Sequence, residues 1–152
     1  MKRFTFTLQA VLTLRQREER DSLEAYAVSL RVRQQAAEAL SEANRMIESI
    51  RSLRLQAGES LATAQAMHQM QIRSELAQTV RAEAAQRLAS AETDLEKRLR
   101  QVMLARQRRE AVEHCREVQL QEYAKLEAQE ENRLLDEFAA RKPVGQLTSF
   151  HG

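Results

Sequence analysis

The sequence predicts an all-α protein in which two long helices fold back on each other as an antiparallel coiled-coil hairpin, the second helix being longer than the first. Charged residues make up 30% of the 152 residues and aromatic residues only 4%. This composition is typical of coiled coils and long helices. Three glycines and one proline leave few places for turns. The apolar residues recur at spacings of three, four or seven, so we expect a narrow buried seam.

The first helix is predicted over residues 8–56, after a short segment MKRFTFT at residues 1–7. Polar runs such as RQREER separate its apolar residues and belong on the side that faces water. The spacing of the apolar stripe is close to 3.5 residues, the period at which two helices can stay in contact. The expected seam residues are Leu23, Tyr26, Leu30, Ala37, Leu40, Ile47 and Ile50.

The second helix is predicted over residues 62–141. Lys142-Pro143 ends it, because proline cannot continue a helix and restricts the residue before it. Residues 142–152 are expected to form a flexible tail after a single hairpin domain at 1–141. The expected seam residues are Ile72, Leu76, Val80, Leu88, Ala91, Leu95, Leu99, Val102, Val112, Tyr123, Leu126, Leu134 and Phe138.

The turn is placed near residues 57–62, where Gly58 can end one helix and Ser60 can cap the next. A turn near residues 64–71 is the alternative. The first placement gives helices of about 50 and about 80 residues, or about 75 and about 120 Å at 1.5 Å per residue. The carboxy-terminal part of the second helix would then extend beyond its partner.

Polar residues interrupt both seams, so we expect a marginal hairpin rather than a very stable one. Polar residues at seam positions lower stability while they fix the register of the two helices. Alanine is also common where a rigid zipper would carry leucine. The polar residues expected in the seam are Arg33, Asn44, Arg109 and Gln119.

The charges are balanced and interleaved, with 24 lysines and arginines against 22 acids and a net charge of +2. A nucleic-acid-binding protein usually concentrates its excess positive charge on one face, so no nucleic-acid partner is expected. Residues 97–109 are nevertheless basic and residues 110–137 acidic. These runs fit a solvated helix surface with register-setting ion pairs, or a charged end that docks into a complementary partner.

Residues for catalysis, metal binding or cofactor binding are not expected. His68, His114 and His151 are far apart in the sequence, and the side chains of neighbours such as His114 and Cys115 diverge on a helix. The chain has too few glycines for a phosphate-binding loop. A two-helix hairpin also offers no enclosed volume for an active site. The protein is therefore predicted not to be an enzyme.

The expected location is the cytoplasm. Cys115 is the single cysteine, which fits a reducing compartment. Polar residues interrupt the apolar residues that follow the amino terminus, which argues against a signal peptide. No apolar run approaches the length that crosses a bilayer.

Both ends of the chain resemble the flagellar FliJ family. Residues 4–15, FTFTLQAVLTLR, match the family's usual start of alternating aromatic residues, a leucine, an apolar pair and an arginine. Residues 130–141, EENRLLDEFAAR, resemble its closing segment, whose core is Asp-Glu, an aromatic or aliphatic residue, and Ala. The family is in turn similar to the SctO/YscO proteins of injection-type secretion, and physical reasoning alone does not separate the two systems.

The resemblance implies a soluble, non-enzymatic component of the flagellar type III export apparatus, in the cytoplasm at the base of the organelle. Such a protein looks like the stalk of a rotary ATPase. Its paired ends would insert into the hexameric export ATPase, and its hairpin tip would face the cytoplasmic domain of the export gate. Family members are also described as escorting export chaperones. Association with the inner membrane would be indirect.

The resemblance also assigns residues to two surfaces, although each of these residues could instead belong to the seam or close the open end of the hairpin. This chain lacks the aromatic residues that the family tends to expose near the turn. The ATPase-facing end would consist of Phe4, Phe6, Leu8, Leu12, Leu134, Leu135, Asp136, Glu137 and Phe138. The gate-facing tip would consist of Ala43, Met46, Ile50, Ile72 and Leu76.

Two other functions remain open from the sequence. One is an unrelated coiled-coil spacer or tether that dimerises through its seam. The other is a nucleic-acid-binding helix centred on residues 97–109.

Overall fold

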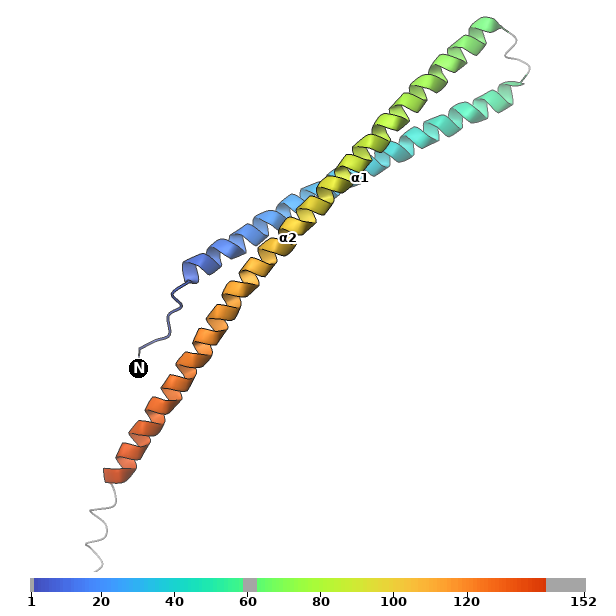
Figure 1. Ribbon diagram of the computed structural model, residues 1–152. Coiled ribbons are helices and arrows are strands. Elements are labelled where there is room, and N and C mark those ends of the chain that lie inside the picture. Colours follow the sequence, from blue (N-terminus) through green and yellow to red (C-terminus); the bar gives the residue numbers. More distant parts are fainter. Residues whose placement is uncertain (1, 59–62, 142–152) are drawn as a thin grey trace, which may run out of the picture. The chain divides into compact units, whose positions relative to one another are not determined.

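The computed structural model describes residues 2–58 and 63–141, which form two α-helices and no strand. Helix α1 comprises Gln9–Ala57 and helix α2 comprises Ala64–Arg141 (Figure 1). Their lengths are 49 and 78 residues, so the second helix is the longer. The predicted all-α fold of two long helices is confirmed.

The helix ends explain where the chain turns. Gly58 follows α1 with a φ of +37°, in the left-handed region that glycine enters without a steric penalty. Thr63 caps α2, because its Oγ1 accepts a hydrogen bond from the backbone N–H of Ala66 at 3.3 Å. A turn at 64–71 is wrong, since α2 is already helical there. The predicted cap Ser60, the Lys142-Pro143 stop and the tail at 142–152 lie outside the described residues.

The chain divides into two compact units, each of which contains part of α1 and part of α2. One unit is Glu18–Ala105, which includes the turn. The other combines Met1–Arg17 with Arg106–Gly152.

Within Glu18–Ala105 the two helices run antiparallel. Near the middle of α1, the Ser29 hydroxyl donates a hydrogen bond to the Asp94 carboxylate at 3.2 Å. Closer to the turn, Arg54 donates one to the Gln71 side chain at 3.0 Å. The residue number on α2 therefore falls as the number on α1 rises, which is the pairing expected of two helices joined by a short turn.

The seam of this unit is built mainly from small residues. Each helix has one row of residues, spaced seven apart, in which every residue is buried or half-buried. Heptad geometry of a coiled coil requires this spacing. Small side chains in these rows allow the helix backbones to approach closely. The row on α1 is Ser22, Ser29, Ala36, Ala43, Ile50 and Ala57, and the row on α2 is Ala77, Ala84, Ala91, Arg98 and Ala105.

Several larger residues that were predicted to lie in the seam are exposed to solvent instead. Their exposed fractions range from 41% to 63%. Within Glu18–Ala105 the prediction followed the largest side chains, whereas the helices pack along rows of alanine beside them: Ala77 is 2% exposed and its neighbour Leu76 is 63% exposed. The three wrongly assigned residues nearest the end of α2 lie in a stretch, 124–141, where every residue is exposed. The wrongly assigned residues are Leu23, Leu30, Ile72, Leu76, Val80, Leu99, Leu126, Leu134 and Phe138.

The remaining seam predictions are confirmed by burial, apart from one polar residue. Arg33, Arg109 and Gln119 are half-buried as expected, and Arg33 forms an ion pair with Glu92 at 3.6 Å. Asn44 is exposed, because it lies next to the row that holds Ala43 rather than in it. The confirmed apolar residues are Tyr26, Ala37, Leu40, Ile47, Ile50, Leu88, Ala91, Leu95, Val102, Val112 and Tyr123.

In the part of the chain that the structure describes, neither helix contains an apolar stretch long enough to cross a membrane.

Candidate partner-binding surfaces

The amino-terminal segment is anchored on α2 through one tyrosine. The rings of Phe4 and Tyr123 lie 5.4 Å apart, centre to centre, and are inclined at 55°. This tilted geometry is favourable for aromatic pairs. The Tyr123 hydroxyl also donates a hydrogen bond to the backbone carbonyl of Lys2. The chain then enters α1, where the N–H of Gln9 donates to the carbonyl of Phe6 at 3.2 Å.

Helix α2 continues for about 18 residues beyond Tyr123, or about 27 Å. Every residue from Ala124 to Arg141 is exposed. In this stretch Leu134 is 54%, Leu135 65% and Phe138 61% exposed. Large apolar side chains that gather on an exposed helix often mark a site for another protein. We refer to Leu134, Leu135, Asp136, Glu137 and Phe138 as the terminal helix surface.

The residues predicted for the ATPase-facing end fall into two groups. Phe4 and Phe6 are half-buried and Leu8 is 40% exposed, whereas Leu12 is only 6% exposed. The structure places Phe4 against Tyr123, which precedes Leu134 by about 11 residues, or about 16 Å along the helix. Phe4, Phe6 and Leu12 are therefore half-buried or buried, whereas Leu8 and the carboxy-terminal group are exposed to solvent.

Tyr123 was assigned to the seam by the sequence, and its second role in holding the amino terminus was missed. The sequence did indicate that Tyr123 needs a further contact, because the hydroxyl of a tyrosine requires a hydrogen-bond partner when its ring is packed. The sequence could not show that this partner is the carbonyl of Lys2.

The terminal helix surface carries negative charge beside its leucines. Glu137 lies 3.8 Å from Arg133, one turn earlier on the same helix. Exposed pairs of this kind stabilise a helix by only a few tenths of a kcal/mol. Asp136, Glu130 and Glu131 are also exposed. A partner that binds this surface therefore meets apolar side chains flanked by carboxylates.

The residues predicted for the hairpin tip, all within Glu18–Ala105, also divide by burial. Met46 is 51%, Ile72 50% and Leu76 63% exposed. Ala43 is 4% exposed and Ile50 is half-buried, and both belong to the α1 row of the seam. Three of the five side chains can therefore touch a partner, while the other two hold the helices together beneath them. We refer to Met46, Ile72 and Leu76 as the tip surface.

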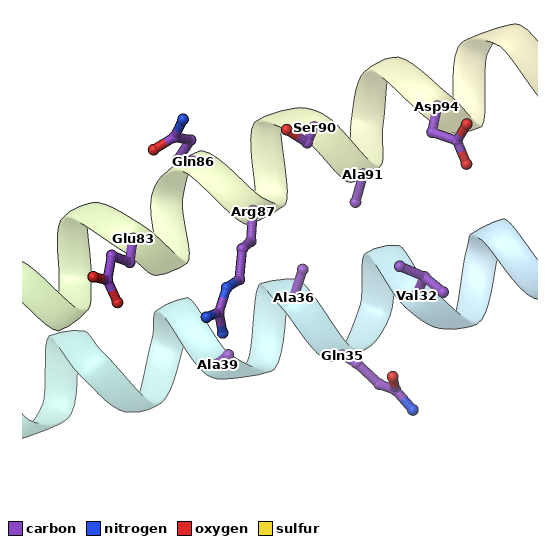
Figure 2. Close-up of a pocket in the computed structure, with 10 residues that line it drawn as sticks. All are labelled: Val32, Gln35, Ala36, Ala39, Glu83, Gln86, Arg87, Ser90, Ala91 and Asp94. Carbon is purple, nitrogen blue, oxygen red and sulfur yellow. The ribbon is translucent and has the colours of Figure 1, made fainter.

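An open groove runs between α1 and α2 in this unit, and Figure 2 shows the side chains that line it. Ala36 and Ala91 point toward each other between the two helices. Arg87 reaches from α2 toward Ala39 on α1. The alanines leave the groove shallow and unfilled, so it provides a surface rather than an enclosed cavity. The other lining residues are Val32, Gln35, Glu83, Gln86, Ser90 and Asp94.

Few polar side chains are buried in the residues that the structure describes. Ser29 is the one polar side chain buried in residues 2–58 and 63–141, and its hydrogen bond with Asp94 satisfies it. Over the same residues, no three or more His, Cys, Asp and Glu side chains are grouped so that they could hold a metal ion. Cys115 is exposed.

Two long helices, antiparallel within Glu18–Ala105, place the chain in the class of helical-hairpin proteins. The model of the family described as "Flagellar FliJ protein" matches residues 4–147, which is nearly the whole chain. The chain therefore belongs to the FliJ family, and the resemblance of its two ends to that family is confirmed. Comparison with curated proteins and with solved structures gives no significant match.

Membership of this family gives the chain a role associated with flagellar export. The family is a structural, non-catalytic component of export, in keeping with a fold made of two helices.

Proposed function

We propose that this chain is a stalk of the flagellar export apparatus, which binds the hexameric export ATPase at one surface and couples it to the export gate at another. The observation that carries the proposal is the exposure of Leu134, Leu135 and Phe138 on a stretch of α2 that is exposed throughout. Exposure of apolar side chains to water is unfavourable in free energy, and a partner that buries them recovers that free energy.

The ATPase would bind the terminal helix surface. A ring of six subunits offers several equivalent contacts, and a single helix presents a different side chain to each of them. Because one helix face is apolar and another acidic, the stalk would favour different states in different subunits without taking part in the chemistry. Phe4 would support this end by fixing the amino terminus on Tyr123.

The tip surface would bind the cytoplasmic domain of the export gate. Met46, Ile72 and Leu76 supply exposed apolar contacts from both helices, and the packed alanines between them keep the spacing fixed. Through these partners the protein would be held in the cytoplasm at the flagellar base, peripheral to the inner membrane. Escort of export chaperones belongs to the same proposal.

A binding experiment with the purified export ATPase tests this function. The wild-type chain is expected to capture the ATPase in the presence of nucleotide. Replacing Leu135 and Phe138 together by alanine should abolish capture, because both side chains are more than half exposed and contribute little to folding. Leu55→Ala is the matched control, since Leu55 is 80% exposed and belongs to neither surface. Absence of capture by the wild-type chain would refute the proposal.

A further inference from the structure

The groove in Figure 2 continues toward the turn as a row of apolar residues on α1. Val32 and Ala39 line the groove, and Met46 and Leu53 follow at the same seven-residue spacing. Residues at this spacing lie on the same side of a helix in a coiled coil. Val32, Met46 and Leu53 are 49%, 51% and 49% exposed. This row is therefore an apolar stripe beside the seam that no described residue covers.

The facing row on α2 extends the same surface. Val80 precedes Arg87 by seven residues, and Leu76 precedes Glu83 by seven. Arg87 and Glu83 both line the groove. Val80 is 41% and Leu76 63% exposed. The residues Val32, Ala39, Met46, Leu53, Leu76, Val80, Glu83 and Arg87 are called the groove face below.

The opposite side of the same helix pair has a different character. A second, smaller groove there is lined by Arg51, Arg54, Ser74 and Gln78, with seam residues beneath them. Arg54 is hydrogen-bonded to a glutamine of α2. Near the turn this side therefore presents Arg51 and Arg54, whereas the groove face presents Met46, Leu53 and Val80 there.

The charges on the groove face match one another. Glu83 and Arg87 are four residues apart on α2, yet within the described ranges 2–58 and 63–141 neither forms an ion pair or a hydrogen bond. A two-fold axis reverses the order of residues on the second molecule, so residue i meets residue j and j meets i. If the axis passes between these two side chains, Arg87 of each copy meets Glu83 of the other. One axis then forms two ion pairs.

The large and small side chains of the groove face are also placed so that the same two-fold axis brings large residues of one copy near small residues of the other. Toward the turn the groove face carries the large residues Met46, Leu53 and Val80. Away from the turn it carries one large apolar residue, Val32, and its floor is made of Ala36 and Ala91. An antiparallel second copy would place the large side chains of one molecule over the alanines of the other. Large residues inserted into small gaps are the usual basis of helix packing in bundles.

We propose that the groove face binds a second copy of this chain, antiparallel, to form a four-helix bundle from residues 32–53 of α1 and 76–87 of α2 of each molecule. The contact covers Met46 and Leu76, two of the three residues of the tip surface. If the tip surface binds the export gate, as the proposed function holds, then self-association and gate binding exclude each other. The dimer is then a resting form whose dissociation exposes the gate-binding residues.

Analytical ultracentrifugation of the full chain tests the proposal without any other protein. The expected result is a reversible monomer–dimer equilibrium with a Kd on the order of 10 μM. A chain that stays monomeric up to about 1 mM overturns it. Binding of that monomer to vesicles of anionic lipid would assign the groove face to a membrane surface and equally overturn the dimer. Because no ATPase or gate domain is present, failure here is separate from failure of the proposed function.

Charge exchange locates the contact. Arg87→Glu and Glu83→Arg should each raise the Kd at least about tenfold, because each brings like charges together across the axis. The double variant restores opposite charges and should return the Kd to within about threefold of wild type. Arg51→Glu on the opposite side is the control and should leave the Kd unchanged. A double variant as weak as the single ones, at unchanged helical circular dichroism, would overturn the proposal.

Discussion

The Ser29 hydroxyl donates a hydrogen bond to the Asp94 carboxylate at 3.2 Å, across 65 residues of sequence. Ser29 is 6% exposed, whereas its neighbours in the same row, Ala36 and Ala43, are alanines that have no side-chain hydrogen bond to offer. An alanine row repeats every seven residues and does not distinguish one register from the next. The Ser29–Asp94 bond therefore supplies a register contact that the alanines cannot.

Loss of this bond should be measurable. We expect Ser29→Ala to lower the free energy of unfolding by about 1 kcal/mol, the usual net value of such a hydrogen bond. Asp94→Ala should cost a similar amount, and the double variant should cost clearly less than the two added together. Urea unfolding followed by circular dichroism gives these values. Strictly additive losses would show that the two side chains act independently.

Because alanines form the seam, enlarging a seam alanine should destabilise the protein more than truncating the leucine next to it. Ala77→Leu should destabilise the protein by about 1–3 kcal/mol, because an added side chain must force the closely packed helices apart. Leu76→Ala, one position earlier, should cost less than about 0.5 kcal/mol, since Leu76 is 63% exposed. Chemical denaturation measures both variants. If instead the leucine truncation proves the more harmful, the seam has been assigned to the wrong row.

Glycine is expected to be required at position 58 because of the backbone conformation there, and not because a larger side chain would clash. Its φ is +37°, and a Cβ built there has no atom within 4 Å. Gly58→Ala should therefore cost about 1 kcal/mol from backbone strain alone. Gly58→Asn should cost less, because asparagine tolerates this region better than alanine. Equal stability of wild type and the alanine variant in thermal unfolding would contradict this explanation.

The contact of Phe4 with Tyr123 should control the order of the amino terminus. Phe4→Ala removes the ring contact and should increase hydrogen exchange of the amides at residues 5–9 by about tenfold, corresponding to about 1.4 kcal/mol. Tyr123→Phe keeps the ring and loses only the hydroxyl, so its effect should be smaller. Exchange read by mass spectrometry distinguishes the two. No change in either variant would mean that the segment is ordered by other contacts.

The sequence predicted the two helices closely, because their apolar period and the scarcity of glycine and proline act locally. It placed the first helix at 8–56 and the second at 62–141, against Gln9–Ala57 and Ala64–Arg141 in the structure. The turn followed from Gly58, whose conformation needs no information from the rest of the chain.

The face on which the helices meet was harder to predict, because both helices carry more large apolar residues than one seam can hold. A rule that follows side-chain size selects Leu76 and Ile72, whereas close approach of two backbones selects Ala77 and Ala84. The choice depends on both helices at once. For the same reason the sequence could not show that Phe4 lies on Tyr123 rather than beside Leu134.

The central claim is that the terminal helix surface binds the export ATPase, and hydrogen exchange of the complex with the ATPase hexamer tests it most directly. We predict strong protection of the amides from residues 126–141 on binding, with little change at residues 43–50 and 72–76. Leu135→Ala with Phe138→Ala should remove this protection. Protection confined to residues 43–76, with exchange at 126–141 unchanged, would contradict the account.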